Sequence, residues 1–135
     1  MIESKVTVLD NECATVWCYP KKRIIHHVFH KYCFGDTFRD ILTKSTEVFE
    51  YYHCTKWLSD DRLYGAVHPD DKAWGDEVWK PRVINAGWKY WAMVLPEKVT
   101  GQLNMQRLVE EYQRLGVITS FHSDPDKAMS WLLEQ

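Results

Sequence analysis

One short segment constrains the fold more than any other: residues 88–95 (Trp-Lys-Tyr-Trp-Ala-Met-Val-Leu) are almost continuously apolar. Gly87 precedes the segment and Pro96 ends it, so it is far shorter than the roughly 18–20 apolar residues that cross a bilayer. A short apolar run of this kind is typical of a strand that is covered on both faces, as in the middle of a parallel sheet. The segment therefore predicts a parallel sheet with other elements packed against both of its faces.

The residues before this segment predict a hairpin, a third strand and a helix. β-branched and aromatic residues dominate at 4–9, 13–19 and 24–31, with short polar turns between them. The pattern then changes, because the next apolar positions fall on one helical stripe: Phe38, Ile41, Leu42, Ser45, Val48, Phe49 and Tyr52. Thr37 and Asp40 resemble a capping box at the start of this helix.

Strands and helices alternate in the rest of the chain. We expect a strand at 54–59, a helix at 69–86 that Pro81 kinks or splits near Trp79 and Lys80, and a helix from an Asn104 cap to Leu115. A strand at 117–121 and a helix from Pro125 to Glu134 complete the order β-β-β-α-β-α-β-α-β-α. This order predicts one α/β domain over 1–135, with a mixed sheet of five or six strands, an N-terminal hairpin, a parallel C-terminal half and four helices. The crossovers should be right-handed.

Composition and motifs argue against several classes of protein. Seventeen Lys and Arg against nineteen Asp and Glu give a formal net charge of -2, which removes the main argument for binding nucleic acid or an anionic membrane surface. No secretory signal or membrane span is recognisable, so we expect a cytoplasmic location. The cysteines, Cys13, Cys18, Cys33 and Cys54, form no C-x-x-C pair, and we expect reduced thiols. No phosphate loop or nucleophile elbow is present, and no catalytic residue, metal or cofactor is predicted.

Several local phrases, in this order, resemble the SpoIIAA-like family, which is grouped with STAS and SEC14-type domains. The phrases lie at 55–62, 86–92, 94–97 and 121–128, with Trp131 and Leu132 in the final helix. The resemblance implies a compact α/β domain of a family found mainly in bacteria and often of unassigned function. Its better-known relatives dock on a protein kinase and are switched by phosphorylation of a serine. Ser59 is the matching serine, but Asp60 and Asp61 follow it, and their like charge disfavours a phosphoserine there.

The quartet Ser59, Asp60, Asp61 and Arg62 follows a predicted parallel strand, where open α/β sheets bind ligands. The segments 96–98, which includes Lys98, and 121–123 should lie at the same edge. In one interpretation the two aspartates accept a cation or amine, and Arg62 binds an anion. In the other, the quartet is a solvated turn in which Asp60 caps backbone N–H groups while Asp61 and Arg62 face solvent.

Histidines and aromatic residues supply two more candidate clusters. His26 and His30 share one strand face and His27 points to the other, so two imidazoles could meet, but a zinc site needs a third ligand that the sequence does not place. Seven tryptophans exceed the ordinary needs of one small core, and tryptophan is enriched at interfaces. We therefore expect some of Tyr64, Trp74 and Trp79 to line a pocket or an oligomer interface.

Three functions remain open on the sequence. The first is a non-catalytic binding or regulatory module that acts through a protein partner or as a homodimer burying Trp79. The second is a carrier of a small apolar or amphipathic ligand, as the SEC14 side of the resemblance implies, with its pocket between the kinked helix 69–86 and the sheet. The third is an enzyme that uses Asp60, Asp61 and His68. The candidate binding residues are Ser59, Asp60, Asp61, Arg62, Tyr64, Trp74, Trp79 and Lys98.

Overall fold

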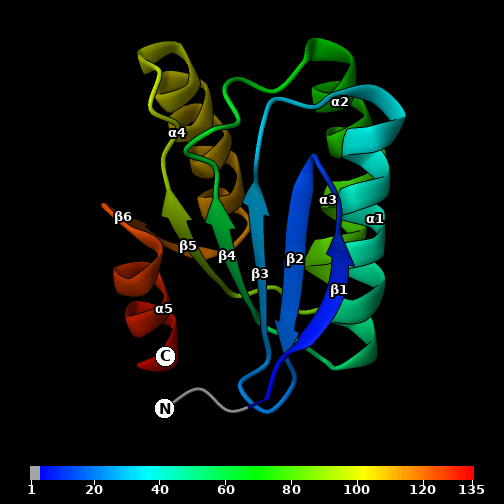
Figure 1. Cartoon of the computed structure of the whole chain (residues 1–135), viewed down its shortest axis with the longest axis vertical. Coiled ribbons are helices and arrows are strands. Elements are labelled where there is room, and N and C mark those ends of the chain that lie inside the picture. Colours follow the sequence, from blue (N-terminus) through cyan, green and yellow to red (C-terminus); the bar gives the residue numbers. More distant parts are fainter. Residues whose placement is uncertain (1–3) are drawn as a thin grey trace.

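Six strands form one mixed sheet in which the order along the chain is also the order in space (Figure 1). β2 (Ala14–Tyr19) is antiparallel to both of its neighbours, β1 (Val6–Asp10) and β3 (Ile24–Phe29). β3, β4 (Lys56–Asp60), β5 (Tyr90–Val94) and β6 (Ile118–His122) are parallel. This computed structural model describes residues 4–135 and confirms the predicted fold class.

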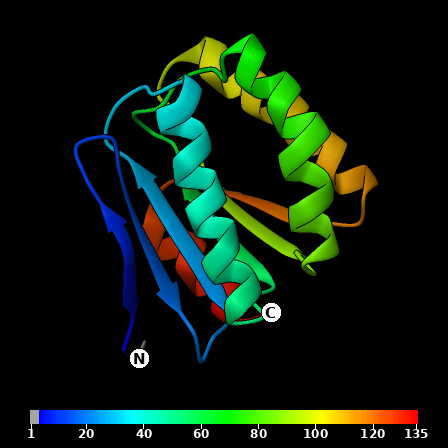
Figure 2. The ribbon, with the colours of Figure 1, turned by 90° about the vertical axis from the view of Figure 1, so that its right-hand side faces the viewer.

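Three helical connections cover one face of the sheet, and the last helix covers the other (Figure 2). The connections are α1 (Gly35–Tyr51), the continuous helix formed by α2 (Pro69–Trp74), η1 (Gly75–Trp79) and α3 (Lys80–Asn85), and α4 (Val99–Arg114). Each joins a parallel strand to its next neighbour in the same direction, so connections of one handedness must lie on one face. α5 (Pro125–Leu133) follows the last strand and packs on the opposite face.

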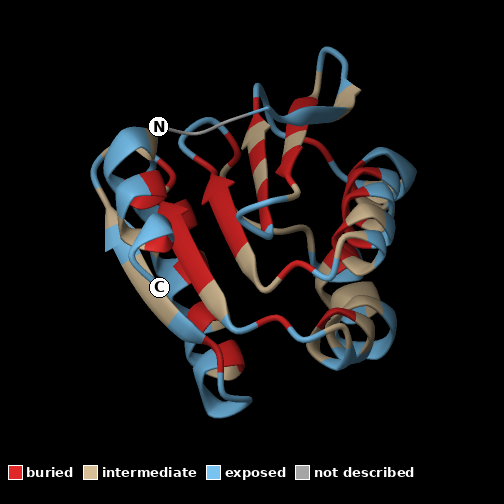
Figure 3. Ribbon diagram, turned by 90° about the horizontal axis from the view of Figure 1, so that it is seen from below, coloured by how far each residue is buried: buried red, intermediate tan, exposed pale blue. Residues whose placement is uncertain are grey.

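The core has two layers because side chains alternate across the strands. Trp57, Trp91 and Met93 point to the face covered by α1, α3 and α4, whereas Leu58 and Ala92 point to α5. Buried positions gather along the central strands and on the helix sides that face them (Figure 3). The expectation that the apolar segment 88–95 is covered on both faces is confirmed.

The start of α1 differs from its prediction. Phe34 is the N-cap and makes no side-chain cap, and the predicted box of Thr37 and Asp40 is wrong. Both carboxylate oxygens of Asp71, on α2, instead accept from the backbone N–H of Gly35, at 3.0 and 3.2 Å. The helix start is therefore satisfied by a side chain 36 residues away, which no local pattern can reveal.

Two other helices also differ from their predictions: α4 begins at another residue, and the helix 69–86 bends at another place. α4 begins at Val99, so Asn104 is internal, and its Oδ1 accepts from the backbone N–H of Val67 at 3.1 Å. The predicted break near Trp79 and Lys80 is a π turn, η1, over Gly75–Trp79. This wider turn ends two residues before Pro81, whose ring would clash with the preceding turn of a regular α-helix.

Two further observations concern the thiols and the membrane. Cys13, Cys18, Cys33 and Cys54 are free thiols, and burial raises the pKa of Cys33 to about 12. No helix within residues 4–135 combines the length and the apolar composition that crossing a membrane requires.

Candidate functional site

The loops that follow β3, β4 and β5 come together at one end of the sheet, at the top of Figure 1. They enclose an open pocket of about 360 Å³, which we call the carboxyl-edge pocket. Parallel sheets bind ligands at this edge because the backbone groups of the loops there are not used in hydrogen bonds between strands. The pocket is lined by His30, Lys31, Tyr32, Arg62, Leu63, Tyr64, Gly65, Pro96, Glu97 and Lys98.

Arg62 is held in the pocket by Asp60. Its Nε donates to Oδ1 of Asp60 at 2.9 Å and its Nη2 donates to Oδ2 at 2.8 Å, a bidentate pair. The Asp60 side chain is 4% exposed and that of Arg62 is 43% exposed, so the pair has a buried acid and an accessible cation. The Nη1 group stays outside this pair. Asp60 thus positions a guanidinium whose remaining donors can reach a ligand.

Two lysines add positive charge to the same rim. Lys31 lies 3.6 Å from Glu12, and both of these side chains are more than half exposed. Lys98 is exposed, and Glu97 is the only acid among the residues that line the pocket. Three cationic side chains and one carboxylate therefore line the pocket, which gives it a net positive charge.

Tyr64 forms the inner wall of the carboxyl-edge pocket. Its ring lies 5.2 Å from that of Tyr32 and 4.5 Å from that of Phe29, and its hydroxyl donates to the backbone oxygen of Cys33 at 3.1 Å. Burial raises the pKa of the Tyr64 phenol, so the hydroxyl stays protonated and keeps this bond. The wall is consequently rigid and aromatic.

Gly101 allows α4 to approach these loops closely. A Cβ atom at this position would lie 2.7 Å from Cβ of Pro96 and 3.1 Å from the backbone of Gly65. Both neighbours line the carboxyl-edge pocket. The absence of a side chain at Gly101 therefore sets the position of two of the three loops.

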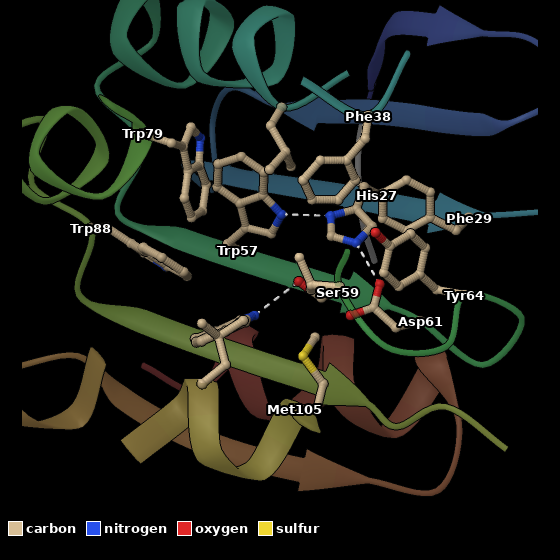
Figure 4. A pocket seen from close by; sticks show the side chains of 14 residues that line it. His27, Phe29, Phe38, Trp57, Ser59, Asp61, Tyr64, Trp79, Trp88 and Met105 are labelled. Atoms are coloured by element: carbon tan, nitrogen blue, oxygen red, sulfur yellow. Dashed lines mark hydrogen bonds and ion pairs between the residues drawn. The ribbon is translucent and has the colours of Figure 1, made fainter. Parts of the chain in front are cut away.

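A second cavity lies deeper, between the sheet and the helices (Figure 4). Its volume is about 60 Å³, and we call it the aromatic cavity because seven aromatic rings border it. It occupies the place predicted for an apolar ligand, between the helix 69–86 and the sheet, but its volume suits only a few heavy atoms. It is lined by His27, Phe29, Phe38, Leu42, Trp57, Ser59, Asp61, Tyr64, Val67, Trp79, Trp88, Trp91, Met105 and Leu108.

A chain of hydrogen bonds joins three buried polar groups at this cavity. The indole Nε1 of Trp57 donates to Nδ1 of His27 at 2.9 Å, and Nε2 of His27 lies 2.8 Å from Oδ1 of Asp61 (Figure 4). An indole nitrogen can only donate, so Nδ1 of His27 is the acceptor. The proton of the neutral imidazole is then on Nε2, from which it is donated to Asp61.

Ser59 is buried in the wall of the aromatic cavity. Its hydroxyl accepts from the indole Nε1 of Trp91 at 2.8 Å, and the residue is 3% exposed. A kinase could not reach this hydroxyl in the folded chain. Burial therefore adds to the charge argument against Ser59 as a phosphorylated switch.

The structure divides the predicted site residues between the two pockets. Arg62, Tyr64 and Lys98 line the carboxyl-edge pocket, with Asp60 behind Arg62. The aromatic cavity is bordered by Ser59, Asp61, Tyr64 and Trp79. Trp74 lies apart from both, with its ring 5.8 Å from the guanidinium of Arg39, and it borders a smaller hollow on the helical surface.

The prediction that Asp61 faces solvent is wrong, because the residue is 2% exposed. β4 ends one residue later than predicted, and the backbone N–H of Asp61 still donates to the oxygen of Val94 on β5 at 3.0 Å. Asp60 does accept from the backbone N–H of Arg62, at 3.4 Å, so the predicted cap is present as a long bond.

The structure does not join the acids to His68, as the enzyme alternative requires. His68 is the N-cap of α2, where its Nδ1 accepts from the backbone N–H of Asp70 at 3.1 Å. Asp60 pairs with Arg62, and Asp61 pairs with His27. Each of the three residues is therefore committed to a different partner.

The clustered histidines are separated in the same way. His30 pairs with Thr15 Oγ1 at 2.8 Å, and His26 lies against the ring of Trp17 on the face opposite to His27. Within residues 4–135, no three His, Cys, Asp or Glu side chains gather in a way that could hold a metal ion.

Sequence reasoning missed His27 and Trp57 as site residues. The available signal was the alternation of β3, because His27 shares a face with Ile25 and Phe29, and both of these are apolar. A histidine on the helix-covered face of a sheet must find polar partners there. The sequence could not supply the register that brings Trp57 and Asp61 to it.

Comparison with known proteins identifies no relative of this chain. No family model matches the sequence, and no curated protein or solved structure is significantly similar to it. The resemblance to the SpoIIAA-like family therefore stays a prediction.

Proposed function

We propose that this protein is a non-catalytic binding module whose site is the carboxyl-edge pocket. Its ligand is a small amphipathic molecule that has an aromatic or flat apolar part and an anionic group. The observation that carries the proposal is the placement of Arg62, Lys31 and Lys98 around one pocket with a tyrosine wall. Aromatic side chains favour stacking on flat ligands, and guanidinium and ammonium groups bind carboxylate, sulfonate or phosphate.

Two features support this choice of ligand over a lipid. The pocket of about 360 Å³ lies in the range of small-molecule sites, whereas the aromatic cavity of about 60 Å³ is too small for an acyl chain. Arg62 is already oriented by Asp60, so binding an anion does not require ordering that side chain.

A fluorescence titration tests the proposal with two dyes of similar shape. The probes are 8-anilino-1-naphthalenesulfonate, which is anionic, and N-phenyl-1-naphthylamine, which is neutral. In the double variant Lys31→Gln/Lys98→Gln, we expect the anionic dye to bind about tenfold more weakly, a loss of about 1.4 kcal/mol. The neutral dye should bind this variant as it binds the parent, because the tyrosine wall is intact.

The matched control is Lys22→Gln/Lys44→Gln, which removes the same charge at two exposed positions outside the pocket. We expect this control to bind both dyes as the parent does. An equal loss of the anionic dye in both double variants would mean that net charge, rather than the pocket, attracts the dye, and the proposal would fail.

A second candidate function, self-association, is favoured by the apolar surface beside the pocket. Phe34 is 60% exposed and Leu63 is 56% exposed, and the ring of Phe34 lies 6.0 Å from that of Tyr32. Exposed apolar patches of this kind are typical of interfaces. If two copies pair through this surface, sedimentation of the parent should give a dimer mass and Phe34→Ser/Leu63→Ser a monomer mass. A monomeric parent excludes this candidate and leaves the dye experiment unaffected.

A further inference from the structure

Among residues 4–135, three acidic side chains are buried, and two of them have an arginine partner. Asp60 pairs with Arg62 over 2.8 Å, and Asp71 pairs with Arg39 over 2.9 Å. Within residues 4–135, the only ion-pair partner of Asp61 is the imidazole of His27. Asp61 therefore differs from the other two in the charge of its partner.

His27 cannot supply the missing positive charge. A charged imidazole carries a proton on both ring nitrogens, but Nδ1 of His27 accepts from the indole of Trp57. A second proton at Nδ1 would place two donors 2.9 Å apart with no acceptor between them. The Asp61 carboxylate is thus buried beside a neutral donor, and a buried anion without a cation is costly.

The surroundings of Asp61 match a cation. One carboxylate oxygen takes the bond from His27 and the other points away from it, towards the side of the cavity where Ser59 lies (Figure 4). The indole rings of Trp57, Trp88 and Trp91 border the same cavity. The face of an aromatic ring is negative, so a cation is attracted to it, and indole is the strongest of the aromatic side chains in this respect.

We propose that the aromatic cavity is a binding site for a small ammonium group, with the Asp61 carboxylate as its counter-charge and the indole rings as its walls. The volume of about 60 Å³ is several times the roughly 10–15 Å³ that a cavity needs to hold one water molecule. A methylammonium group, with two heavy atoms, therefore fits within the space. The Ser59 hydroxyl oxygen accepts one hydrogen bond from Trp91 and has a second lone pair, which can accept from an ammonium N–H.

The cavity adjoins a hollow of about 50 Å³ on the helical surface. Phe38, Val67 and Leu108 border both spaces, and the outer one is also bordered by Asp71 and Asp76. This arrangement gives an ammonium group a path between α1 and α4, beside carboxylates that are paired with cations, Asp71 with Arg39 and Asp76 with Lys72. The proposal does not depend on the carboxyl-edge pocket, since it concerns a different cavity and a ligand of opposite charge.

The test is an NMR titration of the ¹⁵N-labelled protein with methylammonium chloride, read at the indole N–H signals. Methanol serves as the neutral counterpart of the same size, and sodium chloride controls for ionic strength. We expect saturable shifts of the Trp57 and Trp91 signals with methylammonium alone. The same linear response to all three additives would overturn the proposal, whether or not the anionic dye binds at the carboxyl edge.

Three variants locate the site. Asp61→Asn should weaken methylammonium binding at least tenfold, and it should fold because the amide oxygen still accepts from His27. Asp60→Asn is the matched control, since this neighbour is equally buried but lies outside the cavity, and its binding should stay within twofold of the parent. Leu108→Phe fills the cavity from α4 and should abolish the shifts with Asp61 intact. Equal losses in Asp60→Asn and Asp61→Asn, or undiminished binding in Leu108→Phe, would contradict the site.

Discussion

The indole N–H of Trp57 and the Nδ1 atom of His27 lie 2.9 Å apart, and this one contact determines the protonation of the buried imidazole. Because Trp57 can only donate, His27 carries its proton on Nε2 and presents it to Asp61. The two residues belong to neighbouring parallel strands, β4 and β3, so the register of the sheet fixes the contact. The chemistry of the aromatic cavity thus follows from strand pairing.

Replacing Trp57 by phenylalanine should leave Nδ1 of His27 without a donor. An unpaired buried acceptor costs about 1–3 kcal/mol, and the smaller ring adds a packing loss. The total loss of stability is measured by denaturant unfolding.

The tautomer of His27 is tested separately. Long-range ¹H–¹⁵N spectra of the parent should show an unprotonated Nδ1 and a protonated Nε2 at His27. Trp88→Phe is the control, because the Trp88 indole donates to the backbone of Tyr90 and its loss should leave the His27 signals unchanged. A parent with its His27 proton on Nδ1 would refute this tautomer.

Asp71 should be important for stability because it joins two helices. It caps α1 at Gly35 and accepts from Nε of Arg39 at 2.9 Å. Breaking a buried ion pair costs about 3–5 kcal/mol, and since Arg39 is partly exposed we expect Asp71→Ala to fall near 3 kcal/mol. The neighbouring Asp70 side chain is 83% exposed, so Asp70→Ala should change the free energy of unfolding by about 0.5 kcal/mol or less. Similar losses in the two variants would contradict this role.

The Asp71 cap also shows where sequence reasoning reached its limit. The change of hydrophobic period at Phe38 and the apolar segment 88–95 fixed the element order and the fold class, since both depend on local spacing. The cap of α1, the side-chain bond of Asn104 to Val67 and the burial of Asp61 depend on contacts between segments far apart in the chain. Periodicity carries no information about such pairs, so the polar details of the site had to come from the structure.

His26 should make the protein sensitive to acid. Both of its ring nitrogens are buried without a hydrogen-bond partner, and this burial lowers the pKa of His26 from 6.5 to about 4. The unfolded chain binds a proton at His26 below pH 6.5 and the folded chain does so only near pH 4. Stability should therefore fall between these values by at most about 3 kcal/mol and level off below them. In His26→Leu this part of the curve of unfolding free energy against pH should flatten. An unchanged slope would contradict the assignment.

Trp79 should act as a core residue rather than as the centre of a dimer interface. Its indole donates to Thr46 Oγ1 at 2.7 Å, and its ring lies 5.7 Å from those of Trp57 and Trp88. We expect Trp79→Ala to cost about 3–5 kcal/mol in urea unfolding. The neighbouring Val78 is 53% exposed, so Val78→Ala should change the free energy of unfolding by about 0.5 kcal/mol or less. A Trp79→Ala variant that is as stable as the parent but has a lower mass in sedimentation would contradict this role and support a dimer interface at Trp79.

The central claim is that the carboxyl-edge pocket holds an amphipathic anion, and the position of such a ligand on the molecule tests it most directly. The measurement is a map of backbone amide shifts in ¹H–¹⁵N spectra as 8-anilino-1-naphthalenesulfonate is added. The account predicts saturable shifts at residues 30–32, 62–65 and 97–98, with none in the turn between β2 and β3 at the opposite end of the sheet. Shifts centred on the edge strands β1 or β6, or spread evenly over the chain, would contradict it.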